Sequence, residues 1–448
     1  MRAIVVVARG CPAGWLGLYG NEWVATPGLD RLAAEGVVFD RHLSDCPDPA
    51  AAGRAWLTGR HQLPAMAGDP AGHPPAPILL AHLKAAGVRT ALVRANRPAN
   101  DAPATFYAGW DEVFDARPRA GDDSPLAALV RSLPALLDRL AEVPRWLVWV
   151  ETDRLLPPWD VTQELFAAYR ADPDAIEEAE AVEPEDEEDD DDDEEVADEE
   201  CVTTAAEPVV PIEVVPPITD PPTGPFDPAD HDARERLHQS FAAVVSQFDA
   251  ELDGIFDQLR ARGLDQTAAW LLTSDCGYPL GDRGQVGRYR PWLHDEFVHL
   301  PFVVRFPGAA QAGRRVEALT QPADLAPTLL DLFGGDTPTA VHGHSLLPLA
   351  RGEAEAVRAY ACSGLGLGGA SEWRVQTDDR AYLVPGPPPA GDPPRPPRYY
   401  EKPADRWEVN ALRPGATDWA EPWEAVLRAF AAAAQRPGPL VAPPPPGG

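Results

Sequence analysis

The stretch RAIVVVARGCPAGWLGLYGNEWVATPGLDRLAAEG, residues 2–36, contains the pattern that decides the fold. Residues 2–8 predict a strand, because residues 3–8 are continuously apolar and rich in β-branched side chains, which is typical of a strand buried on both faces. A helix is predicted to follow, because Thr26 suits an N-cap, Pro27 suits the first helical position and Gly36 suits the end. A buried strand followed by a helix is the repeating unit of an α/β fold.

The same alternation continues along the chain. Further strands are predicted at 88–93, 146–150, 268–273 and 301–306, and further helices at 78–86, 126–142, 230–262, 323–333 and 419–435. We therefore expect an α/β fold: a large domain, residues 1–355, has a central, mostly parallel sheet flanked by helices, and a smaller α+β subdomain follows at 356–436. The Pro/Gly tail at 437–448 is expected to fray.

Residues 172–228 interrupt this pattern. The part from 172 to 200 holds 20 Asp and Glu and no Lys or Arg, and Pro-rich sequence follows it. Such a segment buries too little apolar surface to offset its chain entropy, so we expect a disordered insertion. The alternative for its Pro-rich part is an extended course pinned along the surface. Besides keeping the chain soluble, residues 172–200 could bind a protein partner or hold cations loosely.

Composition excludes several classes of function. The net charge of −33 comes largely from the acidic segment, and no basic patch predicts a nucleic-acid partner. No apolar run approaches the roughly 20 residues that span a bilayer. No signal peptide is visible at the start, so we expect a cytoplasmic protein without a membrane segment. The five cysteines show no CxxC spacing, which predicts neither a zinc site nor a disulfide framework.

Seven segments between residues 16 and 412 resemble the motifs of one protein family and follow one another in the order that the family has. They read LGLYGNEWVATPGLDRLAAEGVVFDR (16–41), LTGR (57–60), LLTSDCGYPLGDRG (271–284), LHDEFVHLPFVVRFPG (293–308), LTQPADLAPTLLDLFGG (319–335), VHGHSLLPL (341–349) and RYYEKPADRWEVNAL (398–412). Together they resemble the sulfatase family of the alkaline phosphatase superfamily. The resemblance implies the α/β architecture predicted above and, as activity, hydrolysis of sulfuric esters.

The family's nucleophile is a Cys or Ser in a C/S-x-P-x-R signature that is oxidised to formylglycine. Counting back from LTGR places it on Pro49, which has no nucleophilic atom, and the signature's Arg falls beside Arg54. Cys46 lies three residues upstream and is the candidate nucleophile of a shifted loop. The alternative is that Cys46 is an unmodified thiol that packs as a small hydrophobe.

The resemblance also implies a calcium ion as cofactor, held by Asp residues directly after the first strand. Arg9, Gly10 and Cys11 occupy those positions and supply no hard oxygen side chain. Asp275 remains as a vestigial metal ligand, but the next residue is Cys276, which is too soft a ligand for calcium. We expect no cofactor, and Asp275 has an alternative role in capping its turn.

Other charged positions of the family site have changed as well. The positions of its Lys and His residues fall on Ala95, Arg97, Glu151 and Arg290. Four arginines therefore lie in or beside the former site, and a guanidinium can hold an anion where calcium once did. The predicted anion-binding residues are Arg9, Arg54, Arg97 and Arg290. The alternative is that these arginines pair with acidic residues such as Glu151, Asp275, Asp295 or Glu296.

Three functions remain open from the sequence. The first is a pseudoenzyme, a non-catalytic sulfatase-fold protein whose former pocket binds an anionic small molecule or a sulfated glycan. The second is an active sulfatase or phosphoesterase that uses Cys46, helped by Arg54 and Arg290. The third is a scaffold protein that acts through the acidic insertion.

Overall fold

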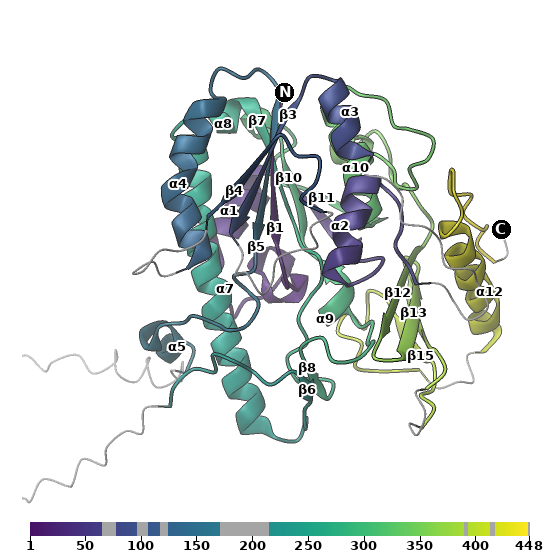
Figure 1. The fold of residues 1–448 in the computed structure, drawn as a ribbon. Helices are drawn as coiled ribbons and strands as arrows, with labels where there is room; N and C mark the ends of the chain where they lie inside the picture. Colours follow the sequence, from purple (N-terminus) through teal and green to yellow (C-terminus); the bar gives the residue numbers. More distant parts are fainter. Residues whose placement is uncertain are drawn as a thin grey trace, which may run out of the picture.

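A central sheet organises the large domain (Figure 1). The computed structural model describes residues 1–64, 78–95, 106–116, 124–170, 215–388, 393–412 and 417–446. In this part of the chain the sheet has nine strands, in the order β11-β2-β10-β7-β1-β5-β3-β4 with β9 beside β2. They are β1 (Arg2–Ala8), β2 (Val37–Leu43), β3 (Arg89–Ala95), β4 (Glu112–Asp115), β5 (Trp146–Thr152), β7 (Ala268–Thr273), β9 (His299–Leu300), β10 (Phe302–Arg305) and β11 (Arg314–Thr320). Only β9 and β10 pair antiparallel within it, so the prediction of a mostly parallel sheet is confirmed.

Strand β1 lies at the middle of the sheet and is buried on both faces. Ile4 and Val6 pack into one layer of the core, whereas Val5 and Val7 pack into the other. Alternate side chains of a strand point to opposite faces, which is why the run is apolar without interruption. The prediction of a strand buried on both faces is confirmed.

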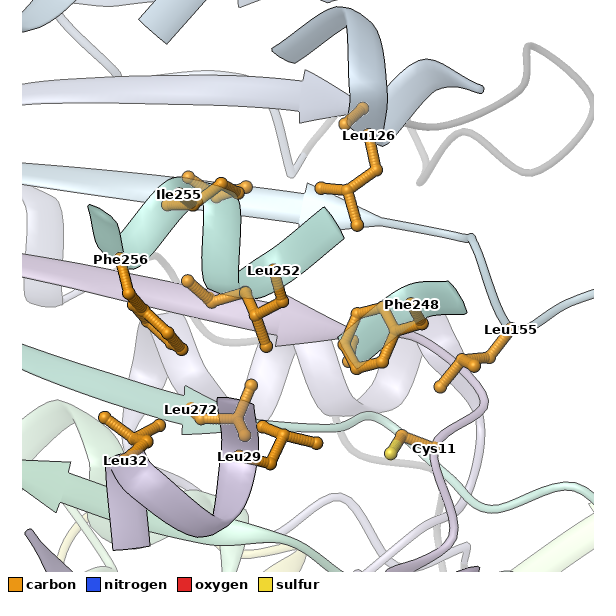
Figure 2. Packing of buried hydrophobic residues seen from close by; sticks show 14 of the residues in the cluster. Cys11, Leu29, Leu32, Leu126, Leu155, Phe248, Leu252, Ile255, Phe256 and Leu272 are labelled. Atoms are coloured by element: carbon orange, nitrogen blue, oxygen red, sulfur yellow. The ribbon is translucent and has the colours of Figure 1, made fainter. Parts of the chain in front are cut away.

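Helices cover both faces of this sheet. One layer contains α1 (Pro27–Glu35), α4 (Pro125–Leu140) and α7 (His231–Arg260), and the other contains α2 (Pro49–Thr58), α3 (Leu79–Ala85), α10 (Leu325–Leu332) and α11 (Leu347–Arg351). Short helices α5 (Gln163–Ala168), α8 (Leu264–Thr267) and α9 (Asp295–Val298) join the strands. Figure 2 shows Leu252 and Phe256 of α7 packed near Leu29 and Leu32 of α1, above the strand that carries Leu272. The three- and four-residue spacing predicted this long helix from the sequence.

The end of the predicted insertion is ordered, which corrects the expectation of disorder up to residue 228. The Ile218 N–H donates to Ser240 Oγ of α7 at 2.9 Å, and β6 (Gly224–Pro225) pairs with β8 (Gln285–Val286). Ile218 and Phe226 pack against the large core, and this burial offsets the cost of ordering the chain. The acidic segment 172–200 lies outside the described residues.

A second, antiparallel sheet follows the large domain. Its strands are β12 (Ala361–Leu367), β13 (Ala370–Gln376), β14 (Arg380–Pro385) and β15 (Arg398–Glu401), and α12 (Thr417–Ala434) packs on it. The tail beyond α12 does not fray as expected. Arg60 of the large domain donates to the Gly438 carbonyl at 3.1 Å, and the Tyr360 hydroxyl donates to the Pro443 carbonyl at 2.7 Å. These bonds hold the tail against both parts of the molecule.

The helices were also compared with the length and apolar character that a bilayer requires. Among the residues that the structure describes, no helix is long and apolar enough to span a membrane.

Candidate functional site

The carboxyl ends of β1, β5 and β7 meet at one edge of the sheet. Because ligands of open parallel sheets bind beyond this edge, it is the place to look for a site. Arg9 follows β1, Glu151 lies near the end of β5, and Asp275 follows β7. All three side chains are buried, with exposed fractions of 7%, 3% and 1%. A charged trio at this depth requires internal pairing.

The Asp275 carboxylate accepts three hydrogen bonds from the protein. Its Oδ1 accepts hydrogen bonds from the Gly10 N–H at 2.9 Å and from the Cys276 N–H at 2.8 Å. Its Oδ2 accepts from Arg9 Nε at 3.3 Å, which makes a buried ion pair. Asp275 therefore both caps its own turn and joins the turns after β1 and β7.

The Arg9 guanidinium is held in its charged form by this environment. Burial lowers its pKa, but the charges of Asp275 and Glu151 outweigh burial and raise the pKa above its ordinary value. The positive charge of Arg9 is thus balanced by carboxylates of the protein itself. This arrangement matches the internal pairing that was one of the two alternatives for Arg9.

These side chains do not fit a calcium ion. Calcium prefers six to eight oxygen ligands, with carboxylates prominent among them. Asp275 is engaged by three donors, Arg9 brings a fixed positive charge, and Cys11 and Cys276 offer only soft sulfur. Within the described ranges, no group of three or more His, Cys, Asp or Glu residues is placed to hold a metal ion. The donor chemistry at this edge therefore disagrees with the family's cofactor.

The amino end of α2 carries the position where the resemblance places the nucleophile. Pro49 begins the helix, and Asp48 caps it because its side chain accepts from the Ala51 N–H at 3.0 Å. Asp48 also forms an ion pair with Arg288 of the loop after β8. A capping carboxylate followed by proline makes a stable helix start, and neither residue provides a hydroxyl or thiol.

Cys46 is buried and packs among apolar side chains. Its exposed fraction is 6%, and its neighbours in the cluster include Ala51, Cys276 and Leu293. Burial raises the pKa of the Cys46 thiol well above its ordinary value, and the charges of Asp45 and Asp48 raise it further. Since the thiolate is the reactive form, this environment suits a packed thiol rather than a nucleophile.

The other predicted anion-binding residues have contacts of their own where the structure describes them. Arg54 is exposed on α2 and donates to Gln62 Oε1 at 3.0 Å. Arg290 stacks over the Trp292 ring at 4.5 Å, and Arg97 lies outside the described residues. Neither of these two contacts involves Arg9.

Sequence reasoning missed two arginines that gather beside Arg290. Arg398, the first residue of β15, lies 3.8 Å from the centre of the Trp292 ring, and Arg395 lies 5.5 Å from it. More than 100 positions of the chain separate these arginines from Trp292. The RPPR spacing at 395–398 was the only local signal, and arginines in Pro-rich sequence are not diagnostic.

A cavity of about 1140 Å³ lies nearby, between the turns after β1 and β7 and the segment 402–409 of the C-terminal subdomain. Neither Arg9 nor Asp275 lines it. Its charges are largely paired across the wall, as Arg41 is with Asp378 at 3.1 Å and Arg283 with Glu296 at 3.5 Å. Burial raises the pKa of Glu296 to about 7. This cavity therefore lacks the excess positive charge that would favour an anion.

Comparison with known proteins agrees with this architecture. The solved phosphonate monoester hydrolase of Agrobacterium radiobacter has the same fold, with a TM-score of 0.65 and 18% identity over 96% of this chain and 94% of that one. A protein solved in complex with its substrate D-glucosamine-2-N,6-O-disulfate gives a TM-score of 0.65 at 16% identity, over 95% and 96%. The chain therefore shares the fold of these two solved proteins.

Sequence comparison places the chain more closely. The family model named Sulfatase matches residues 162–335. Steryl-sulfatase of Mus musculus is 27% identical over 410 residues, which cover 79% of this chain and 65% of that protein. Extracellular sulfatase SULF-1 homolog of Drosophila melanogaster is 35% identical over 138 residues, or 30% of this chain and 12% of that protein. Residues 162–335 thus match the sulfatase family, and the chain spans less than two thirds of these two relatives.

Proposed function

We propose that this chain is a non-hydrolytic member of the sulfatase family that binds an anionic ligand, such as a sulfated or phosphorylated molecule or glycan. The observation that carries the proposal is the buried ion pair between Arg9 and Asp275. It lies where the β1 and β7 turns meet and engages the one carboxylate that remained of the metal site. A fixed guanidinium at this position leaves no room for the divalent cation that the family uses.

The rest of the catalytic set supports the same proposal. Pro49 has no side chain that could attack a sulfate ester, and the thiol of Cys46 is buried with a raised pKa. Removing one member of a group that acts as a unit already costs most of the rate. Here the nucleophile and the metal ligands differ together.

A hydrolysis assay tests the proposal. The full chain is incubated with an aryl sulfate, an aryl phosphate and an aryl phosphonate, with calcium present and after chelation. We expect rates equal to buffer alone in every case. Release of the aryl alcohol that depends on protein concentration and disappears in a Cys46→Ala variant would establish the alternative, an enzyme that uses Cys46.

Mass spectrometry of the peptide containing Cys46 separates the same alternatives without a substrate. We expect the mass of an unmodified cysteine, because a buried thiol with a raised pKa reacts poorly. A formylglycine mass at this position would contradict the proposal even if the assay found no substrate.

A further inference from the structure

Three guanidinium groups surround the indole ring of Trp292. Arg398 lies 3.8 Å, Arg290 4.5 Å and Arg395 5.5 Å from the ring centre. Arg290 comes from the loop after β8 of the large domain, and the other two come from the C-terminal subdomain. The cluster therefore lies at the seam between the two parts, and its three arginines are only partly buried.

The charges in this Trp292 cluster do not balance. Among the described residues, its carboxylate is Glu372 of β13, which lies 3.3 Å from Arg395 and also accepts from the Leu293 N–H. Burial raises the pKa of Glu372, while burial and mutual repulsion lower the pKa of Arg290 and of Arg398. In the part of the chain that the structure describes, three cations thus face one anion.

A neighbouring ion network at the same seam differs from the Trp292 cluster because its charges balance. There Arg374 pairs with Asp295 at 2.6 Å and with Glu408 at 2.8 Å, and Lys402 pairs with the same two carboxylates. Two cations meet two anions, as buried structural charges generally do. The Trp292 cluster has no such balance, so holding the seam together does not explain it.

Several donors of the cluster also lack an acceptor. Arg290 Nε and Trp292 Nε1 are buried, and within the described part of the chain neither has a hydrogen-bond partner. Arg398 donates to His294 Nε2 at 3.0 Å, but His294 is neutral because burial lowers its pKa to about 4. An acceptor bound at the cluster would satisfy both Arg290 Nε and Trp292 Nε1.

We infer that Arg290, Arg395 and Arg398 form a binding site for the tetrahedral oxyanion of a phosphate or sulfate ester. A guanidinium presents a planar fork of donors that matches two oxygens of such a group, and three forks from two sides would enclose it. Binding would supply the charge and the acceptors that the cluster lacks. The inference rests on the proposed function only in requiring an anionic ligand, and it moves that ligand away from Arg9.

Calorimetric titration of the full chain with inorganic phosphate, and separately with inorganic sulfate, tests the site. We expect saturable one-to-one binding that weakens by about tenfold in Arg290→Gln and in Arg398→Gln, as loss of one charge-assisted contact predicts. Arg428→Gln is the matched control, because Arg428 is exposed on α12 and pairs only with Glu424 there. Its affinity should equal that of the unaltered chain.

The Glu372→Gln variant distinguishes an anion-binding site from a purely structural cluster of arginines. Removing the one carboxylate beside the arginines should tighten phosphate binding several-fold, because the amide keeps an oxygen for the Leu293 N–H while the negative charge is lost. Thermal unfolding gives a second reading. Phosphate should raise the Tm of the unaltered chain and of Arg428→Gln, and at the same concentration should raise that of Arg290→Gln by less.

The results of these titrations distinguish the proposed Trp292 site from the broader proposal that the chain binds an anion. Tighter binding of phosphate than of sulfate assigns a phosphate ester, and the reverse assigns a sulfate ester; both support the site. If an anion binds equally well to Arg290→Gln and Arg398→Gln, this site is wrong although anion binding stands. If neither anion gives a saturable heat with the full chain, both the site and the anion-binding part of the proposed function fail.

Discussion

At the scale of single residues, the interpretation of the site depends on the positive charge of Arg9. Arg9 occupies a position where the resemblance to sulfatases implies an acidic metal ligand, and it forms an ion pair with Asp275. The sequence predicted that the calcium ligands had changed, because the flanking segments located each position independently. It left open whether Arg9 would bind an outside anion or pair internally. The choice between these two roles depended on Asp275, which lies 266 positions further along the chain. The parallel pairing of β1 with β7 brings Arg9 and Asp275 into contact.

Removing the carboxylate should therefore destabilise the protein. Asp275→Asn leaves the buried Arg9 charge poorly compensated, and breaking a buried pair costs about 3 kcal/mol. Urea unfolding should show a lower free energy of unfolding by this order. Arg9→Met combined with Asp275→Asn should recover part of the loss, because the Arg9 charge is no longer stranded while Glu151 loses its neighbouring cation. A single variant as stable as the unaltered chain would mean that the pair contributes little.

At the scale of elements, the start of α2 is stabilised by a cap and a proline. Asp48 caps the first turn and Pro49 occupies the first helical position. Asp48→Ala should lower the free energy of unfolding by about 1 kcal/mol, the usual value of an N-cap. Asp48→Asn is the matched control, because Asn caps equally well and loses only the partly exposed ion pair with Arg288. Equal losses in both variants would show that the ion pair, not the cap, matters.

Elements with strong local signals were predicted from the sequence. The continuous apolar run of β1 and the spacing and caps of α7 each specify one structure locally. The ordered segment 215–228 and the tail after α12 were not foreseen. Their Pro-rich sequence has little periodicity, and bonds to distant residues such as Ser240 and Arg60 hold them in place. The same holds for the arginines around Trp292, which come together only when the two sheets meet.

At the scale of the whole molecule, buried histidines link stability to pH. His42 of β2 is enclosed in the core, stacks on Phe302 and contacts Thr320, and burial lowers its pKa from 6.5 to about 3. Below 6.5 the unfolded chain binds a proton there that the folded chain does not bind until about 3. The stabilisation is therefore complete above 6.5 and is lost as the pH falls towards 3, with a slope of about 1.4 kcal/mol per pH unit in between.

A comparison with His42→Gln isolates this contribution. The free energy of unfolding of the unaltered chain should fall more steeply than that of the variant as the pH drops from about 7 to about 4. Parallel curves in urea unfolding would show that the pKa of His42 is the same in the folded and the unfolded chain, which would contradict the prediction. Other titrating groups contribute equally to both proteins and cancel in the difference.

The central claim concerns the metal centre, and calcium calorimetry tests it most directly. The full chain is chelated, exchanged into clean buffer and titrated beside a chain lacking residues 172–200, because the acidic segment can hold calcium loosely. Arg9→Asp combined with Cys276→Asn is the positive control, since it returns oxygen ligands beside Asp275, and it should gain calcium affinity. We predict no tight stoichiometric site in either parent chain. A tight one-to-one site in the shortened chain would contradict the account and restore ester hydrolysis as the leading function.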